Sequence, residues 1–389
     1  MQDAQRLLSK TYVNFVSKQG LQNLKNYRYH GVDHSICAKY LQPWWTWLVK
    51  FTPLWLAPNL ITLIGLLFVF LSFAVQFYYC PDLKGDAPRW TFLLHAFCLF
   101  MYQTLDALDG KQARKTGTSS PLGELFDHGC DAISTMFIGL TICATIQMGA
   151  GWITFGVMMT NFCAFYFAQW EEFQTGTLEL GIANVTEVQI LGILVHLFTF
   201  FVGPLWWTTP LLINIGVTRI VMTKATLLYI AQVCGAFGTL CGNLVKIFKL
   251  TVQHDSKLKK DQVWLHLLPA LSTVLFAGLW AWFSPSHILQ NHPAAFLIGI
   301  GNLFSYLVGR MVLARVCQEG FSGYQPIILP VVFAFFNTFF GQIIMDEVTL
   351  MYLLLVGFTL VYLHFAFSVV DELTRHLKIR CFIIPYPKK

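Results

Sequence analysis

The sequence predicts an all-α polytopic membrane protein, with about ten transmembrane helices and an N-terminal amphipathic helix that lies in the membrane interface. Of its 389 residues, 56% are hydrophobic and 12% are charged, whereas a soluble domain carries about 25% charged residues. Apolar runs recur along the chain, each close to the ~20 residues that a helix needs to cross the hydrocarbon core. Basic residues fall between these runs, so we interpret the net charge of +6 as membrane topology rather than as nucleic-acid binding.

The N-terminal region contains no apolar stretch of the kind found in a cleavable signal peptide. Residues 1–40 are polar with scattered lysines, so the first span is expected to act as its own insertion signal. Residues 42–55, QPWWTWLVKFTPLW, are rich in tryptophan, which suits a helix lying in the interface. The alternative is that this segment extends the first span.

Ten apolar runs are the candidate spans, and an even number places both chain ends on one side of the membrane. The sixth run contains Gly235, Gly238 and Gly242, and a face of small residues suits close helix packing in lipid. The predicted spans are residues 59–79, 89–108, 126–147, 150–170, 186–205, 225–246, 262–283, 294–315, 325–345 and 349–370.

The distribution of basic residues predicts which side of the membrane is cytosolic. If both chain ends are cytosolic, all but four of the 26 Lys and Arg residues lie on that side. The four exceptions are Lys84, Arg89, Arg219 and Lys224. The positive-inside rule therefore places both ends in the cytosol. The sequon at residues 184–186, Asn-Val-Thr, falls on the same side by span parity, so we expect it to carry no N-linked glycan.

The ten cysteines form no C-x-x-C pair and no Cys/His zinc spacing. Most of them lie inside apolar runs, where a cysteine behaves as a small hydrophobic residue. We therefore predict no disulfide framework.

Residues 106–131, DALDGKQARKTGTSSPLGELFDHGCD, carry four aspartates at fixed offsets between two apolar runs. Asp106 and Asp109 are spaced i, i+3, and Asp127 and Asp131 are spaced i, i+4, so on helices each pair lies on one face. Ionised groups at a membrane boundary are costly and need a partner. Hard divalent cations prefer carboxylate oxygens, so the four aspartates are the predicted metal ligands.

The same stretch resembles a known family. The pattern D-x2-D-G-x2-A-R-x8-G-x3-D-x3-D matches, position for position, the signature of the CDP-alcohol phosphotransferases. The whole run is similar to the eukaryotic choline and ethanolamine phosphotransferase branch, as are residues 53–65, 88–93, 184–190 and 308–311. The resemblance implies transfer of phosphocholine, phosphoethanolamine or both from CDP-choline or CDP-ethanolamine to diacylglycerol. The products would be phosphatidylcholine or phosphatidylethanolamine and CMP.

This reaction explains why four carboxylates are needed together. Phosphoryl chemistry depends mainly on positioning and charge neutralisation, and two divalent ions about 3.5–4 Å apart provide both. We therefore expect two Mg²⁺ or Mn²⁺ ions per site.

Other residues of the motif are candidates for contacts to the CDP-alcohol. Lys115 has two interpretations, a contact to phosphate oxygens or a positive-inside charge. Gly123 also has two, a substrate contact or close helix packing. The residues expected to bind the CDP-alcohol are Asn59, Gly110, Ala113, Arg114, Gly123 and Glu124.

The attacking hydroxyl needs a proton acceptor, and His128 is the first candidate. A histidine titrates near pH 6.5 and suits general-base work, although a single histidine is usually structural. In the eukaryotic branch that this chain resembles, the matching histidine is the proposed base and the residue matching Glu124 contacts the nucleotide-alcohol. In bacterial relatives the fourth aspartate is usually given the base role, so Asp131 is the alternative.

The residues that recognise the alcohol headgroup are harder to identify. Quaternary ammonium groups are held by aromatic faces and nearby acids. Such a cage is one interpretation of Phe165, Tyr166, Trp170, Glu171 and Glu172, although tryptophan near a span end is more often a membrane anchor. Glu187 is a second candidate, and its alternative role is a helix N-terminal acid that follows Asn184 or Thr186.

Two other functions compete with this interpretation. An ethanolamine-only enzyme or another CDP-alcohol phosphotransferase would use the same motif. A transporter would place its charges near the bilayer midplane across several spans, whereas these acids cluster at one span boundary. Headgroup and acyl-chain preference stay open.

The resemblance also implies an organisation and a location. It implies a homodimer in the endoplasmic reticulum membrane, with the Golgi and the nuclear envelope as alternatives, and an active site that faces the cytosol. We divide the chain into a cytosolic N-terminal segment with the interfacial helix, a catalytic transmembrane core, C-terminal transmembrane helices and a cytosolic tail. Their bounds are 1–58, 59–250, 251–372 and 373–389.

Overall fold

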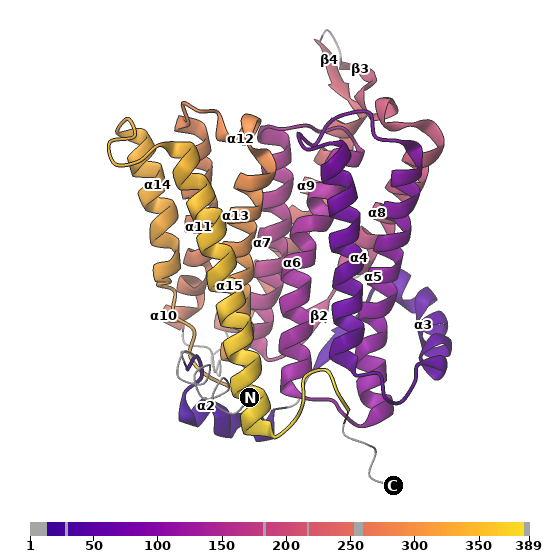
Figure 1. The fold of residues 1–389 in the computed structure, drawn as a ribbon, viewed down its shortest axis with the longest axis vertical. Coiled ribbons are helices and arrows are strands. Elements are labelled where there is room, and N and C mark those ends of the chain that lie inside the picture. The colour runs from indigo at the N-terminus through magenta and orange to yellow at the C-terminus, as the bar shows by residue number, and fades with distance from the viewer. Residues whose placement is uncertain (1–13, 28–29, 182–183, 216–217, 253–259, 385–389) are drawn as a thin grey trace, which may run out of the picture.

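The computed structural model describes residues 14–27, 30–181, 184–215, 218–252 and 260–384. Long helices run side by side as a bundle, with short elements at its two ends (Figure 1). The bundle helices are α4 (Pro58–Tyr79), α5 (Arg89–Thr116), α6 (Pro121–Thr145), α7 (Trp152–Thr175), α8 (Val185–Val202), α9 (Lys224–Val252), α11 (Leu268–Phe283), α13 (Pro293–Val316), the shorter α14 (Leu329–Phe339) and α15 (Glu347–Leu377). The helices at the bundle ends are α2 (Lys18–Asn23), α3 (Ile36–Leu48), α10 (Lys260–Val263) and α12 (Ile288–Asn291).

The remaining elements are five 3₁₀ turns and two small sheets in the described residues. Strand β1 (Gly31–Asp33) pairs in parallel with β2 (Leu178–Leu180), and β3 (Pro210–Ile215) forms an antiparallel hairpin with β4 (Thr218–Thr223). The 3₁₀ turns are Leu24–Asn26, Val49–Phe51, Pro204–Thr208, Trp264–Leu267 and Pro326–Ile328.

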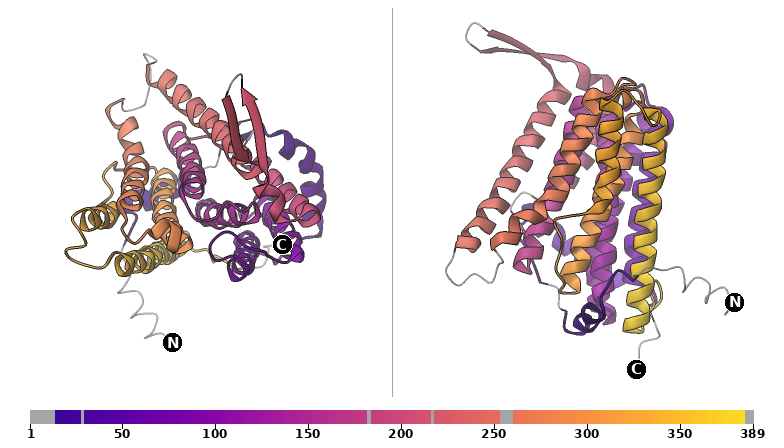
Figure 2. Two further views of the ribbon diagram at one scale, coloured as in Figure 1. Left: turned by 90° about the horizontal axis from the view of Figure 1, so that it is seen from above. Right: turned by 90° about the vertical axis from the view of Figure 1, so that its left-hand side faces the viewer.

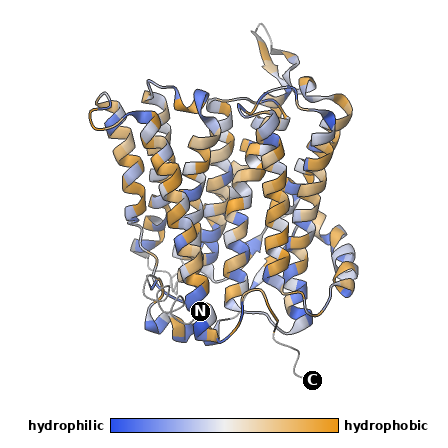
Figure 3. Cartoon of the chain, in the orientation of Figure 1, coloured by the Kyte–Doolittle hydropathy of each residue, from blue (hydrophilic) through white to orange (hydrophobic). Residues whose placement is uncertain are grey.

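The predicted all-α membrane architecture is confirmed, and every predicted span overlaps one long helix. Seven described helical segments are long and apolar enough to cross a membrane: α4, α5, α8, α9, Trp264–Phe283, α13 and α15. The predicted span 325–345 was too long, because α14 ends at Phe339 and the chain turns through Gly341 and Gln342, both with positive φ. Apolar residues dominate the middle of the bundle, while polar ones gather toward its ends (Figure 3).

The N-terminal amphipathic helix is present but begins earlier than predicted. Helix α3 spans Ile36–Leu48 and lies beside the lower end of the bundle rather than within it (Figure 1). Trp44, Trp47 and Phe51 are exposed on it and on the 3₁₀ turn that follows. The alternative, that this segment extends the first span, is wrong, because the chain leaves helical structure between residues 52 and 57 before α4 begins.

Local sequence signals set the turn between α5 and α6. Helix α5 continues through Gly110 to Thr116 and ends at Gly117, whose φ of 67° favours glycine. Ser120 then caps α6 by accepting a hydrogen bond from the Gly123 N–H, and Pro121 occupies the first helical position. The short turn places the last turns of α5 beside the first turns of α6.

The helices differ greatly in how much of their surface other helices cover. Helix α13 lies at the centre of the largest core, and 83% of its most apolar window is buried. Helix α9 is splayed from the bundle (Figure 2), and only 6% of its window is buried. Helix α2 and the C-terminal end of α15 lie at one end of the bundle, opposite the β3–β4 hairpin (Figure 1). The described parts of the two chain termini therefore lie at the same end of the bundle, as an even number of spans predicts.

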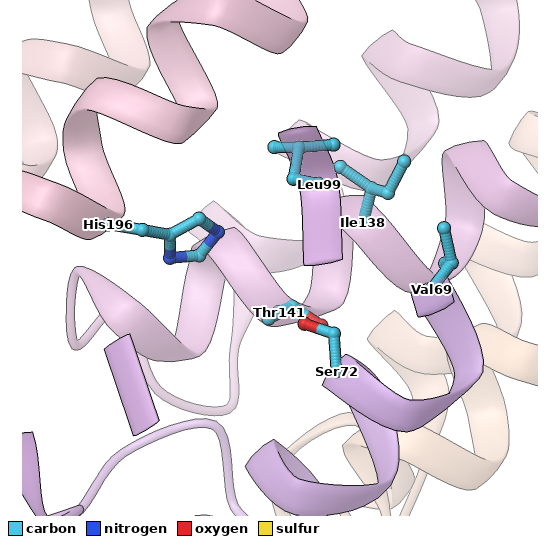
Figure 4. Close-up of a pocket in the computed structure, with 6 residues that line it drawn as sticks. All are labelled: Val69, Ser72, Leu99, Ile138, Thr141 and His196. Carbon is cyan, nitrogen blue, oxygen red and sulfur yellow. The ribbon is translucent and has the colours of Figure 1, made fainter. Parts of the chain in front are cut away.

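A small cavity lies within the half of the bundle nearer the hairpin. It has a volume of about 10 Å³ and is lined by Val69, Ser72, Leu99, Ile138, Thr141 and His196 (Figure 4), which leaves room for about one water molecule. Ser72 lies ten residues beyond Thr62 on α4, about 15 Å along the helix. The cavity is therefore separate from the acidic residues described next, because Thr62 contacts them.

Candidate active site

The fold brings the four predicted metal ligands together. Carboxylate oxygens of Asp106, Asp109 and Asp127 all lie within 4.8 Å of one another, and ligand atoms of Asp127, His128 and Asp131 do the same. The first two aspartates come from the last turns of α5 and the others from the first turns of α6. We call Asp106, Asp109, Asp127 and Asp131 the aspartate cluster.

Hydrogen bonds from neighbouring helices hold two members of the aspartate cluster in place. The Thr62 hydroxyl on α4 donates to Asp109 at 2.5 Å. The Tyr102 hydroxyl donates to Asp131 and lies 2.6 Å from the Ser134 hydroxyl. These groups fix the carboxylates but bring no positive charge.

The aspartate cluster fits a divalent cation. Asp127 Oδ1 is buried and has no hydrogen-bond partner, and in the described part of the chain no lysine or arginine forms an ion pair with any of the four carboxylates. A buried carboxylate without a partner is costly. Four carboxylate side chains, one of which has an unpartnered oxygen, are the kind of ligand set that hard cations prefer.

A second group of acids lies on the other side of His128, and here one arginine contacts both carboxylates. The Arg315 guanidinium on α13 lies 2.5 Å from Glu124 Oε1 and 2.8 Å from Glu172 Oε1. The Tyr27 hydroxyl donates to Glu124 at 2.6 Å and accepts a hydrogen bond of 2.7 Å from Arg315. We call Glu124, Glu172, Arg315 and Tyr27 the Glu–Arg cluster.

Tyr27 precedes the first span and acts as a proton donor in this cluster. Burial raises the pKa of its hydroxyl above the ordinary value, and the neighbouring Glu124 carboxylate adds to the shift, while Arg315 offsets part of it. The hydroxyl therefore keeps its proton at physiological pH and donates it to Glu124.

His128 lies between the two clusters. Its ligand nitrogens fall within 4.8 Å both of Asp127 and Asp131 and of Glu124 and Glu172. The ring is buried, neither nitrogen has a hydrogen-bond partner, and Nδ1 is 3.9 Å from Asp131 Oδ2. A buried imidazole with two unsatisfied nitrogens beside a cation site is available to take a proton.

The predicted CDP-alcohol ligands lie around the same end of α5 and α6. Asn59 is buried at the start of α4, and its Oδ1 lies 3.6 Å from the position that a Cβ on Gly123 would occupy. A Cβ on Gly110 would meet only the Arg114 guanidinium, at 3.6 Å, so space is open beside that backbone. Ala113 lies on the same turn as Arg114, whose side chain is exposed.

Lys115 makes contacts that neither alternative predicted. Its ammonium donates to the backbone carbonyls of Val49 and Thr52 at 2.8 and 2.7 Å. It therefore ties the end of α5 to the linker between α3 and α4.

The chain end after α15 returns to the site. Asn59 Nδ2 donates to Cys381 Sγ at 3.4 Å, and the Phe382 ring packs edge-on against Phe126 at a centroid distance of 5.5 Å. Residues 379–384 thus lie against the first turns of α4 and α6, and nothing in the sequence pattern indicated this.

The residues considered for a headgroup cage do not converge. Tyr166 donates to the His266 carbonyl at 2.7 Å, and Trp170, fully buried, donates to the Val263 carbonyl at 3.0 Å. Glu171 pairs with Lys246 at 2.5 Å, and Glu172 belongs to the Glu–Arg cluster. These contacts indicate packing roles, and a headgroup role for Trp170 or Glu171 stays a prediction without a structural basis.

Glu187 has the alternative role that was considered for it. It forms a capping box with Asn184 at the start of α8. Its other oxygen accepts hydrogen bonds from the Ser35 hydroxyl at 2.6 Å and the Cys37 N–H at 3.0 Å. Glu187 therefore attaches α3 to α8.

Sequence reasoning missed four residues of the site: Tyr27, Thr62, Tyr102 and Arg315. One signal was available for Arg315, because an arginine within an apolar span marks a functional site by default. No local pattern distinguishes Thr62 or Tyr102 from other residues of their helices. Tyr27 lies in the polar N-terminal region, where the sequence shows no periodicity.

Comparison with known proteins agrees with these features. A family model described as CDP-alcohol phosphatidyltransferase matches residues 55–231. The choline/ethanolaminephosphotransferase 1 of Arabidopsis thaliana is 36% identical, over 96% of this chain and 99% of that protein. The cholinephosphotransferase 1 of Xenopus laevis is 34% identical, over 95% and 90% of the two chains, and that of Rattus norvegicus is 30% identical, over 95% and 92%.

Proposed function

The chain belongs to the CDP-alcohol phosphatidyltransferase family, and on that premise we propose that it transfers phosphocholine, phosphoethanolamine or both from the CDP-alcohol to diacylglycerol. The products are phosphatidylcholine or phosphatidylethanolamine and CMP. The observation that carries this proposal is the aspartate cluster, in which four carboxylates meet without a basic partner in the described residues.

The aspartate cluster is proposed to hold two Mg²⁺ or Mn²⁺ ions, with Asp106, Asp109, Asp127 and Asp131 as protein ligands. Such ions supply charge neutralisation on the pyrophosphate and on the leaving CMP. Thr62 and Tyr102 keep two of the carboxylates in position, so that little reorganisation accompanies binding.

The chain's own residues carry the proton. The diacylglycerol hydroxyl oxygen forms a bond to the phosphorus that bears the alcohol, and the bond from that phosphorus to the bridging oxygen breaks, releasing CMP. The hydroxyl proton moves to a nitrogen of His128, which is buried and otherwise unbonded. Asp131, whose Oδ2 is 3.9 Å from His128 Nδ1, is the alternative acceptor.

Binding of the CDP-alcohol is assigned to the residues that surround the aspartate cluster. Arg114 is exposed near the bundle end and suits a bidentate contact to phosphate oxygens. Glu124 is held by Tyr27 and Arg315, so its carboxylate has one orientation toward a bound nucleotide. The remaining proposed contacts are Asn59, Gly110, Ala113 and Gly123.

The decisive experiment compares both donors on one preparation. Purified protein with diacylglycerol and Mg²⁺ should convert labelled CDP-choline, CDP-ethanolamine or both into the corresponding phospholipid, with CMP in equal amount. Conversion of CDP-ethanolamine alone would select the ethanolamine-only alternative. No phospholipid from either donor, under conditions in which a related choline/ethanolaminephosphotransferase is active, would reject the proposal.

We propose that the protein resides in the membrane of the endoplasmic reticulum and that its active site faces the cytosol. The sequon at Asn184 tests the orientation, because it lies at the same bundle end as the aspartate cluster. The Asn184 side-chain amide donates hydrogen bonds to Asp33 and to the Gly181 carbonyl at 2.9 and 3.0 Å. A glycosidase should produce no mobility shift. A shift that is lost in Asn184→Gln would place this loop in the lumen.

Assembly as a homodimer stays a prediction from the family resemblance. Helix α9 offers an uncovered face, on which a Cβ at Gly235, Gly238 or Gly242 would meet nothing within 4 Å. Cross-linking in native membranes through a cysteine at Gly238, with the same change at Gly357 as control, would test whether this face meets a second copy.

A further inference from the structure

A cleft on the outside of the bundle lies apart from the active site. It has a volume of about 560 Å³ and is formed by α13, the connection after it and the first turn of α14. Its lining residues are Tyr306, Arg310, Ser322, Tyr324, Gln325, Pro326, Ile327 and Pro330. The connection lies at the bundle end that also holds α2, because Asn23 donates to the Cys317 carbonyl at 3.0 Å. This is the end at which the aspartate cluster lies.

Two arginines of α13 differ in what balances their charge. Arg315 lies between two glutamates, whereas Arg310 forms no ion pair within the described residues. Five residues on a helix correspond to about 140° of rotation, so the two side chains leave α13 in different directions. The Arg310 cleft is therefore not an extension of the active site.

The Arg310 side chain is held at the cleft by an aromatic ring. The guanidinium carbon lies 5.6 Å from the centre of the Phe15 ring, a cation–π distance. Phe15 is itself fixed, since its N–H donates to Glu372 at 3.1 Å and its ring packs against Phe365 at 5.2 Å.

Neutral donors complete the polar side of the cleft. Ser322 Oγ accepts a hydrogen bond from the Tyr324 N–H at 3.1 Å, and the Gln325 amide donates to the Ser322 carbonyl at 2.8 Å. These bonds hold the loop and leave the Ser322 hydroxyl proton for another acceptor. Pro326, Ile327 and Pro330 provide an apolar wall on the other side.

Arg310 lies six residues before the end of α13, about 9 Å along the helix, and the headgroup region on each side of a bilayer is about 5–8 Å thick. An unpaired guanidinium, a hydroxyl donor and an apolar wall at this depth match a phosphate joined to a glycerol backbone. The uncompensated positive charge favours a lipid with net negative charge over a zwitterionic one. We propose that the Arg310 cleft binds the headgroup phosphate of an anionic phospholipid from the same leaflet as the active site.

The test measures lipid binding rather than turnover, so that it is independent of the proposed function. Native mass spectrometry of the full chain in detergent would compare dioleoylphosphatidylserine with dioleoylphosphatidylcholine, and inorganic phosphate would be added as a soluble competitor. The variants are Arg310→Gln, Arg310→Lys and Ser322→Ala. The matched control is Arg375→Gln, which removes an exposed arginine paired with Asp371 near the same bundle end.

We expect phosphatidylserine to bind in preference to phosphatidylcholine, and Arg310→Gln to weaken it at least tenfold, about the effect of losing one charge-assisted hydrogen bond. Arg310→Lys should weaken phosphatidylserine binding less than Arg310→Gln does. Ser322→Ala should weaken it a few-fold, and Arg375→Gln should leave it unchanged. Equal binding of the two lipids, unchanged binding in Arg310→Gln, or displacement by millimolar inorganic phosphate would each overturn the proposal. If Arg310→Gln fails to purify as a folded protein, unchanged binding in Ser322→Ala overturns it.

Discussion

Two groups of buried or half-buried carboxylates lie on either side of His128, and they differ in which groups contact them. In the Glu–Arg cluster, Arg315 contacts both glutamates and Tyr27 donates to one of them. In the aspartate cluster, the side-chain hydrogen bonds to the carboxylates within the described residues come from hydroxyl groups, and no lysine or arginine there pairs with them.

The difference indicates which cluster receives an external cation. A buried charge that a protein side chain neutralises is part of the folded structure, and removing its partner is strongly destabilising. A buried charge with no internal partner is tolerated where an external cation arrives. We infer that the Glu–Arg cluster fixes the geometry around His128 and that the aspartate cluster receives the metal ions.

The largest expected effect comes from removing single carboxylates of the aspartate cluster. Asp106→Asn, Asp109→Asn, Asp127→Asn and Asp131→Asn should each lower transfer by about 10³-fold or more, because loss of a metal ligand costs several kcal/mol at the transition state. A chelator should abolish wild-type activity. Labelled CDP-alcohol and diacylglycerol provide the assay.

Thermal unfolding then separates the two clusters. Mn²⁺ should raise the unfolding temperature of the wild type and of Glu172→Gln, because a cation that binds only the folded state stabilises it. The rise should be much smaller for Asp106→Asn, which lacks one of the metal ligands. Asp371→Asn, an exposed residue paired with Arg375, is the control for activity and for the Mn²⁺ effect. Full turnover in any two of the four aspartate variants would contradict the two-metal model.

The next effect concerns the residue between the clusters. His128→Ala should reduce turnover about 10²–10⁴-fold, the usual contribution of a positioned base, while CDP-alcohol binding changes little. Initial rates and equilibrium binding measured on the same preparation separate the two quantities, with His34→Ala at an exposed site as control. Near-normal turnover, together with an inactive Asp131→Asn that still binds Mn²⁺, would transfer the base role to Asp131.

A third effect is on stability. Arg315→Gln leaves Glu124 and Glu172 without their cation and should lower the free energy of unfolding by about 3–5 kcal/mol. Adding Glu172→Gln should restore part of that loss, because one uncompensated charge is removed with it. Denaturant unfolding in detergent measures both, and Arg375→Gln should change stability by less than about 1 kcal/mol. If Arg315→Gln were as mild as this control, the internal compensation of the Glu–Arg cluster would be refuted.

These clusters also show how far sequence can predict a site. The spacing of Asp106 and Asp109, and of Asp127 and Asp131, predicted four acids on two helical faces, and the short turn at residues 117–120 makes those faces neighbours. That information is local. The partners of Glu124 come from opposite ends of the chain and meet it only through the packing of α13 and the path of the N-terminal region.

The same limit explains the headgroup prediction. Aromatic and acidic residues at 165–172 follow one another in sequence, but a helix distributes them around its axis. Tyr166 and Trp170, one turn apart, therefore face the segment before α11, whereas Glu172 faces Arg315. Sequence proximity within a helix does not make a cage.

The smallest expected effect tests whether Tyr27 contributes to the Glu–Arg cluster beyond charge balance. Tyr27→Phe keeps the ring and the Arg315–Glu124 contact but removes the hydrogen bond donated to Glu124 and the one accepted from Arg315, which should lower the free energy of unfolding by about 1.5–3 kcal/mol. Burial keeps the hydroxyl protonated, so the difference from wild type should not change between pH 6 and 9. Tyr40→Phe, at an exposed position on α3, is the matched control and should have no effect. Unchanged stability in Tyr27→Phe would show that Arg315 alone compensates the two glutamates. A difference that disappears at alkaline pH would show that the hydroxyl ionises in the folded protein, contrary to its buried environment.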